Sequence, residues 1–310
     1  MAKQKNNDSK KDKEKFYYNE WWAPYADVIG ADETLALHFG HYEKGVKSHK
    51  DAVVNKNDFI GRILNLDSVE KNSVYLDSGC GVGGTSIYLA KKYPNIKFIG
   101  ITNSPGQIFL ANKFSKDLKV NSNTEFIVGD YLKIGVIDNY FDGIFTLQAF
   151  MRGPDKKKFL QEAYRVLKPN KKLVIDDVFL KKKPSSFIMK NSYNVYLKIW
   201  KIPSIEVINK IKSDLEEVGF QDIEVLDITK GFRLSFMILN LKWLIHSFFP
   251  KRKTNKRKKS VKKQKIVFQK DKKSALDNPF LGEIFKFISP IPLGFSGNLR
   301  YMTITAVKKE

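Results

Sequence analysis

The sequence predicts an α/β protein with a doubly wound, mostly parallel sheet of seven strands and helices on both faces. Two observations support this fold class. Short apolar segments alternate with helix-like segments between residues 74 and 228, and the first apolar segment runs directly into a glycine cluster at residues 79–84. A strand, a glycine turn and a helix in succession open an α/β unit, and repetition of that unit builds a parallel sheet.

The expected elements follow from hydrophobic periodicity. Helices are expected at residues 85–93, 105–116, 155–167 and 205–218. Strands are expected at residues 74–77, 97–101, 125–128, 141–145, 172–176, 222–228 and 300–306. About seventy residues separate the last two strands, which is too long for an ordinary connection. We therefore expect a long insertion before the last strand.

Composition divides the chain around this core. The core is expected at residues 71–230, and residues 299–310 supply its last strand. Residues 16–70 have an aromatic, helical pattern and are expected to form an N-terminal helical lid. Residues 231–298 are expected to form a helical lid insertion that contains a polybasic loop at residues 251–273. The molecule is thus predicted to be one α/β core with two additions.

The net charge of +22 is concentrated in short segments. Residues 251–273 carry 13 Lys and Arg against Asp271 alone, and residues 1–15 carry six Lys against three acidic residues. Residues 1–15 lack an apolar core, so we expect a disordered basic tail rather than a secretory signal. A hydrophobic content of 42% excludes a mainly disordered or fibrous chain. Because the excess charge is local, it indicates a local partner.

Cysteine usage bounds the chemistry further. Cys80 is the only cysteine, which excludes an intramolecular disulfide and a CxxC metal pair. We therefore predict no metal site and a cytoplasmic protein, since a single thiol suits a reducing compartment. The longest apolar-leaning stretch, residues 234–249, is interrupted by polar residues and is too short to span a bilayer.

The motif that carries chemistry is the loop Asp77-x-Gly79-x-Gly81-x-Gly83-Gly84 between a strand and a helix. Glycines allow a ligand to approach the main chain closely, and the next helix offers unpaired backbone N–H groups. The loop lacks the Lys-Ser/Thr pair of a phosphate-binding P-loop. A tight structural turn is the alternative interpretation of the glycines.

Several segments, in order and spacing, resemble class I S-adenosylmethionine-dependent methyltransferases. Val74–Ala90 (VYLDSGCGVGGTSIYLA) looks like their first motif. Ile99–Gln107 (IGITNSPGQ) resembles the branch that includes sterol, tocopherol and coclaurine methyltransferases and cyclopropane fatty acid synthases. Val128–Asp130 resembles the acidic loop after the third strand, and Phe141–Lys168 the fourth strand and its helix. Leu35–Asn55 is similar to the substrate-side helix of the same branch.

This resemblance implies S-adenosyl-L-methionine as the cofactor. Position by position, Asp77, Gly79, Cys80 and Gly81 would hold its methionine and ribose part, mostly through the backbone. The sulfonium of this cofactor is already activated, so the protein mainly aligns the reactants and excludes water.

The second and third strands would supply the remaining cofactor contacts. Thr102 and Asn103 stand where many class I enzymes place a ribose-binding carboxylate, so Asn103 and Gln107 are the expected polar contacts. Asp130 would accept a hydrogen bond from the adenine amino group, and Tyr131 would flank the ring. A helix cap or a surface turn is the alternative role for Asp130.

Two positions depart from the pattern of the family. Sterol and tocopherol methyltransferases commonly carry a Glu and a His where this chain has Gln148 and Arg152. Neither replacement is a general base at neutral pH, because an amide does not titrate and Arg stays charged. We therefore expect Gln148 to orient the cofactor ammonium or the acceptor, and Arg152 to bind an acidic acceptor. A polar rim of the pocket is the structural alternative.

A general base, if one is needed, is sought in the substrate-side segment. Three of the four histidines lie between His38 and His49. His41 and Tyr42 are the first choice for catalytic contact, because the FGHYE sequence matches the substrate-side segment of the family. A packed or capped histidine is the alternative for each.

The insertion combines an apolar helix with a cationic run. Leu234, Ile238, Leu241, Ile245 and Phe248 fall at helical spacing, and such a stripe is usually core. Residues 251–265 follow with ten Lys and Arg and no acid. This composition favours peripheral contact of residues 234–265 with an anionic membrane surface. Nucleic acid is less favoured, because the run lacks interleaved aromatic residues for base stacking.

The sequence thus predicts a methyltransferase that acts on a small, lipophilic acceptor such as an isoprenoid, sterol-like, quinone or fatty compound. Three alternatives stay open: a small polar acceptor, an RNA or protein acceptor bound by the basic loop, and a non-catalytic scaffold. The acceptor atom and the oligomeric state are not specified by the sequence.

Overall fold

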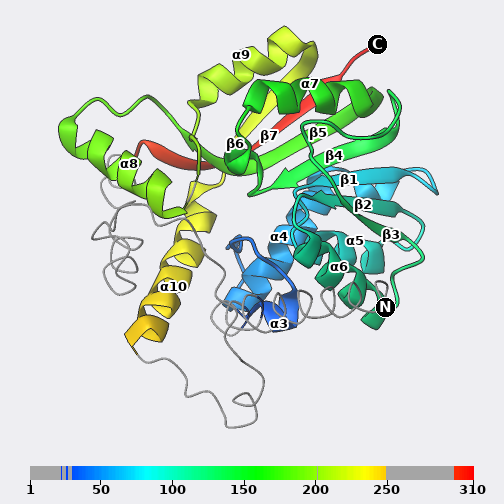
Figure 1. The fold of residues 1–310 in the computed structure, drawn as a ribbon, viewed down its shortest axis with the longest axis horizontal. Helices are drawn as coiled ribbons and strands as arrows, with labels where there is room; N and C mark the ends of the chain where they lie inside the picture. The colour runs from blue at the N-terminus through cyan, green and yellow to red at the C-terminus, as the bar shows by residue number, and fades with distance from the viewer. Residues whose placement is uncertain (1–21, 23–25, 27–29, 201, 249–296) are drawn as a thin grey trace, which may run out of the picture.

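The computed structural model describes Trp22, Ala26 and residues 30–200, 202–248 and 297–310. Seven strands form one sheet in the order β3-β2-β1-β4-β5-β7-β6, and β7 runs antiparallel to its neighbours β5 and β6 (Figure 1). The strands are β1 Val74–Ser78, β2 Lys97–Thr102, β3 Thr124–Val128, β4 Phe141–Leu147, β5 Leu167–Leu180, β6 Phe220–Asp227 and β7 Leu299–Lys308. The predicted fold class is confirmed.

Helices cover both faces of the sheet. They are α3 Ala31–Thr34, α4 His49–Ile63, α5 Gly84–Lys92, α6 Pro105–Asp117, α7 Lys156–Val166, α8 Phe187–Trp200, α9 Ile208–Val218 and α10 Thr229–Phe248. In Figure 1, α7 and α9 lie above the sheet, whereas α4, α5 and α6 lie below it. Two apolar clusters fill these two layers, one under α7 and α9 and one under α4 to α6.

Strand order places a crevice at one edge of the sheet. From β1 the chain builds outward through β2 to β3 and then returns to the other side of β1 with β4. In doubly wound sheets, ligands bind outside the carboxyl ends of the strands where this reversal occurs. The ends of β1, β2 and β4 therefore define where a ligand site is expected.

Sequence-based bounds hold for most elements. Ser104 caps α6 through its Oγ, which accepts from the backbone N–H of Gln107, and Pro105 takes the first helical position. Asp155 caps α7 in the same way through the N–H of Lys158. Helix α8 was not predicted, although Pro184 and Ser186 precede it and the Ser186 hydroxyl accepts from Met189 N–H.

The predicted domain boundaries remain predictions. The basic tail 1–15 and the polybasic loop 251–273 lie outside the described residues. The described part of the insertion is helix α10, which begins at Thr229 rather than at residue 231.

Helix α10 is oriented opposite to the expectation of a core stripe. Leu234, Met237, Leu241 and Ile245 are exposed, whereas Ser235, Leu239 and Asn240 are buried. The buried side is held by Leu239, which packs in an apolar cluster with Val82 and Leu110, and by Ser235, which accepts a hydrogen bond from Gly40 N–H. Among the described residues, no helix has the length and apolar character needed to cross a membrane.

Candidate functional site

A cavity of about 670 Å³ opens at the carboxyl ends of β1, β2 and β4. It brings together residues from widely separated parts of the sequence. All ten residues predicted to bind the cofactor line it: Asp77, Gly79, Cys80, Gly81, Thr102, Asn103, Gln107, Asp130, Tyr131 and Gln148. The volume is typical of a small-molecule site.

The glycine loop lines the cavity with bare backbone. Gly79 and Gly81 have φ angles of 90° and 56°, a left-handed conformation that side chains strain. A Cβ atom on Gly79 would lie 2.3 Å from the Cβ of Ala149. A Cβ atom on Gly84 would lie 2.2 Å from the carbonyl oxygen of Leu35. The loop can therefore keep its position between β4 and residue 35 only with glycine at these points.

Asp77 stands at the end of β1 and is buried. Its Oδ2 accepts a hydrogen bond of 2.7 Å from the Ser86 hydroxyl of α5. Burial raises the pKa of Asp77 to about 7, and the Ser86 hydrogen bond opposes this shift. Burial also raises the pKa of the Cys80 thiol, so that side chain is neutral. A ligand that donates hydrogen bonds to Asp77 would compensate the cost of its burial.

The end of β2 and the loop after β3 add polar groups. Thr102 Oγ1 donates to Gln107 Oε1 over 2.8 Å, which joins the strand end to the first turn of α6. Asn103 is exposed beside them. Asp130 Oδ1 accepts from Leu132 N–H at 2.9 Å, so part of its carboxylate closes a local turn. The Tyr131 hydroxyl donates to the carbonyl of Ala149 at 3.3 Å.

The remaining lining residues of the cavity are mostly aromatic and apolar. Tyr196 and Trp200 of α8, Leu239 of α10 and Met151 contribute to its lining. Arg152 is the basic residue among the described lining residues. The contribution of α8 to this lining was not expected from the sequence, because the helix itself was not predicted.

His38 lines the cavity and uses both ring nitrogens in hydrogen bonds. Nδ1 lies 3.1 Å from the carbonyl oxygen of Phe39, and Nε2 lies 3.0 Å from Oδ1 of Asn57. Burial lowers the pKa of His38 to about 4, and the hydrogen bonds to Phe39 and Asn57 oppose the shift. This ring is neutral and occupied, so it is a weak candidate for a general base.

His41 and Tyr42 do not line the cavity, which corrects the contact predicted for them. The His41 ring packs against Phe59 of α4 with centroids 4.9 Å apart, and its Nε2 lies 3.7 Å from Glu43. Tyr42 N–H donates to the carbonyl of Gly231 in α10. These two side chains therefore lie outside the cavity, whereas His38 is part of its lining.

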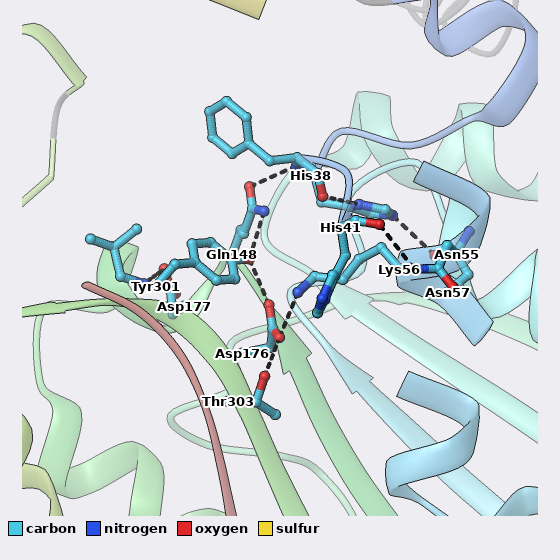
Figure 2. A network of polar contacts seen from close by, with 12 residues as sticks. His38, His41, Asn55, Lys56, Asn57, Gln148, Asp176, Asp177, Tyr301 and Thr303 are labelled. Carbon is cyan, nitrogen blue, oxygen red and sulfur yellow. Dashed lines mark hydrogen bonds and ion pairs between the residues drawn. The ribbon is translucent and has the colours of Figure 1, made fainter. Parts of the chain in front are cut away.

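Gln148 belongs to a buried polar network that Figure 2 shows. Its Nε2 lies 2.7 Å from the Tyr301 hydroxyl, which donates to Asp176 Oδ1 over 2.6 Å. Lys56 Nζ lies 2.7 Å from Asp176 Oδ2, and Thr303 Oγ1 donates to the same oxygen. The network therefore joins α4, β4, β5 and β7.

Both partners of the central ion pair are buried, with exposed side-chain fractions of 1% for Lys56 and 0% for Asp176. Burial lowers the pKa of Lys56, and the attraction to Asp176 opposes that change. The ammonium also lies 4.6 Å from the ring centroid of Tyr301. Asp176 lies inside β5 rather than at its end, and it anchors α4 and β7 to the sheet.

The network also holds the segment Leu35–Phe39, which lines the cavity. Gln148 Oε1 accepts from the backbone N–H of Phe39 at 3.2 Å. The next N–H, of Gly40, donates to Ser235 Oγ of α10 at 2.7 Å. Both ends of the Gln148 amide are therefore engaged, and Gln148 acts here as a positioning residue for the lid.

Comparison with known proteins agrees with this geometry. Residues 69–222 match the methyltransferase domain family. The chain is 31% identical over 195 residues to the 2-methyl-6-phytyl-1,4-hydroquinone methyltransferase of Synechocystis, covering 61% of this chain and 60% of that protein. It is 27% identical over 198 residues to the sterol 24-C-methyltransferase of Kluyveromyces lactis, covering 62% and 51%.

A solved structure extends the similarity of fold. A putative sarcosine dimethylglycine methyltransferase from Galdieria sulphuraria superposes with a TM-score of 0.71 at 19% identity, covering 96% of this chain and 98% of that one. The sequence matches span only about half to 60% of the length of the two curated relatives.

Residues 69–222 thus match the methyltransferase domain family, and the fold is shared with the solved methyltransferase structure. The curated relatives that this segment resembles include sterol and tocopherol methyltransferases. The cavity fits the cofactor of that family, because its glycine loop keeps backbone exposed and Asp77 is a buried acceptor beside it.

We predict that Lys56→Met destabilises the protein by about 3–5 kcal/mol, because it leaves Asp176 as an uncompensated buried charge. Urea unfolding of the full chain measures this change. Lys50→Met removes an exposed pair with Glu33 and should leave stability nearly unchanged. The double variant Lys56→Met/Asp176→Asn should regain part of the loss. Equal stability of Lys56→Met and Lys50→Met would contradict the structural role of the buried pair.

We also predict that Asp77→Asn changes stability in a pH-dependent way. The pKa of Asp77 is about 7 in the folded protein against 3.8 unfolded, so the unfolded state loses its proton first as pH rises. Between about pH 4 and 7, wild-type stability should fall relative to the variant by up to about 1.4 kcal/mol per pH unit. Unfolding at pH 4, 6 and 8 measures the difference, and a difference independent of pH would refute the prediction.

Proposed function

We propose that this protein transfers the methyl group of S-adenosylmethionine to a small, lipophilic acceptor. The observation that supports it most directly is the composition of one cavity lining. Ten predicted cofactor residues line this cavity, together with aromatic and apolar side chains of α8 and α10. The activities named for the matched relatives, on a phytyl hydroquinone and on sterols, agree with a lipophilic acceptor.

At the cofactor end, Asp77 would accept hydrogen bonds from the methionine and ribose part, with the glycine loop in backbone contact. Asn103 and Gln107 lie where they would bind the ribose, since both line the cavity at the end of β2. Asp130 and Tyr131 would hold the adenine. When bound, S-adenosylmethionine supplies an activated methyl group on a sulfonium.

The residues of the chain then mainly orient the acceptor and exclude water. The segment from Leu35 to Phe39 covers the cavity, and Gln148 and Ser235 hold its backbone in place. At the acceptor end, the described lining residues include no side chain with a pKa shifted toward neutrality. His38 has a pKa of about 4, and burial raises the pKa of Tyr196 far above its usual value. This arrangement favours an acceptor that needs no proton removed by the protein.

We further propose that α10 brings the enzyme to an anionic membrane surface. Four apolar side chains on one side of α10 are exposed, and Arg233 and Lys242 of the same helix are exposed with them. Ten basic residues follow in the sequence at 251–265. An exposed apolar helix face beside cationic residues is typical of interfacial binding, in which each basic residue contributes about 1 kcal/mol. A lipophilic acceptor would be met at the same surface.

Isothermal titration with S-adenosylhomocysteine tests the cofactor site. We predict that Gly81→Ala weakens binding at least about tenfold, because the added methyl group enters the cradle beside Leu37. Gly45→Ala is a matched control, since Gly45 also has a positive φ of 93° but has open space around it. Wild-type protein that does not bind S-adenosylhomocysteine would overturn the proposed function.

Vesicle sedimentation tests the surface. We predict that the full chain binds vesicles of phosphatidylcholine with 30% phosphatidylserine, and that Met237→Glu/Leu241→Glu reduces binding at least about tenfold, because two charges then enter the contact face. Ile137→Glu is the control, since Ile137 is 75% exposed in a loop far from α10 in the sequence. Binding that α10 does not influence, or preferential binding to RNA, would contradict the proposal.

A further inference from the structure

Arg152 lines the cavity beside the aromatic residues Tyr196 and Trp200. It ends the short helix Phe150–Arg152 after β4 and is exposed. The acidic residues of the described lining, Asp77 and Asp130, belong to the cofactor end. Among the described residues, no carboxylate oxygen lies within 4 Å of the Arg152 guanidinium. Its charge is therefore not neutralised by a side-chain partner there.

Trp200 provides a second donor beside it. The Arg152 Nη1 lies 3.4 Å from the carbonyl oxygen of Trp200, so the two residues are adjacent. The indole Nε1 of Trp200 is buried and has no hydrogen-bond partner among the described residues. Nε1 is covered by protein atoms, so an oxygen group reaches this unpaired donor when the indole turns toward the cavity. Both residues line the same cavity.

The nearest buried acid does not cancel this positive charge. Asp177 accepts hydrogen bonds from the backbone N–H groups of Met151 and Val178, at 2.9 and 2.8 Å. Burial raises the pKa of Asp177 to about 7, so its charge is reduced near neutral pH. Lys156, on the same side, donates its ammonium to the carbonyls of Met151 and Gly153. Of these two cations, Lys156 is engaged by backbone carbonyls, and Arg152 is the one that lines the cavity.

We infer that this end of the cavity is an anion subsite, in which Arg152 and the Trp200 indole N–H bind an acidic oxygen group of the acceptor. The inference rests on the proposed function and narrows its substrate class to amphipathic acids: an apolar body against Tyr196, Met151 and Leu239, and a carboxylate at Arg152. A carboxylic acid enters already ionised near neutral pH. It therefore matches a cavity whose described lining offers no effective general base.

Titration of the full-length protein saturated with S-adenosylhomocysteine tests the subsite. The probes are 4-butylbenzoate and its neutral counterpart 4-butylbenzamide, which share an apolar body. The wild type should bind the carboxylate at least about tenfold more tightly than the amide. R152Q should abolish this preference, because it weakens the binding of the carboxylate alone. Trp200→Phe should weaken carboxylate binding about threefold, because it keeps an aromatic side chain but removes the indole N–H.

The control variant is Lys158→Gln, which removes one charge from an exposed position of α7 outside the cavity lining and should keep the preference. Equal binding of the two probes to the wild type, a preference that survives R152Q, or no carboxylate binding would overturn the anion subsite. S-adenosylhomocysteine binding is measured first in every variant. If the wild type does not bind S-adenosylhomocysteine, the proposed function is refuted. If it binds S-adenosylhomocysteine but shows no preference for the carboxylate, only the anion subsite is refuted.

Discussion

The buried ion pair between Lys56 and Asp176 is the interaction on which the arrangement of this molecule depends. Asp176 lies within β5 and accepts from Lys56 of α4 and from Tyr301 and Thr303 of β7, which are two distant parts of the chain. Burying two charges is costly, and it is tolerated only where additional hydrogen bonds satisfy both groups. Here those bonds tie the N-terminal helix α4 and the last strand to the centre of the sheet. The pair thus specifies where the added segments dock on a common α/β core.

From this anchor a continuous set of contacts reaches the ligand cavity. Tyr301 contacts Gln148, and Gln148 holds the backbone of Phe39 above the opening. The replacement of an acid by an amide at position 148 therefore has a structural reason, since an amide donates to Tyr301 and accepts from Phe39 at once. A carboxylate there would lack the donor and would stand close to Asp176. Gln148 thus departs from the family pattern at a position where its amide holds the backbone of Phe39 at the cavity.

Helix α10 connects this interior to the outside of the molecule. Its buried side supplies Ser235 to the lid and Leu239 and Asn240 to the cavity lining, while its other side exposes apolar residues. A single helix therefore borders both the acceptor space and the surface proposed to meet a membrane.

The sequence by itself determined the strands, the glycine loop and ten residues that line one cavity. These features depend on local rules: alternation of apolar residues, helix caps such as Ser104, and positive φ angles that only glycine adopts without strain. Only the tertiary structure decided which histidine faces the cavity, since His38 and His41 are three residues apart and differ in the packing of Phe59 and Gly231 around them. It also decided that α8 supplies Trp200 to the acceptor end and that the apolar stripe of α10 faces outward. Such choices depend on contacts between segments distant in sequence, which periodicity does not encode.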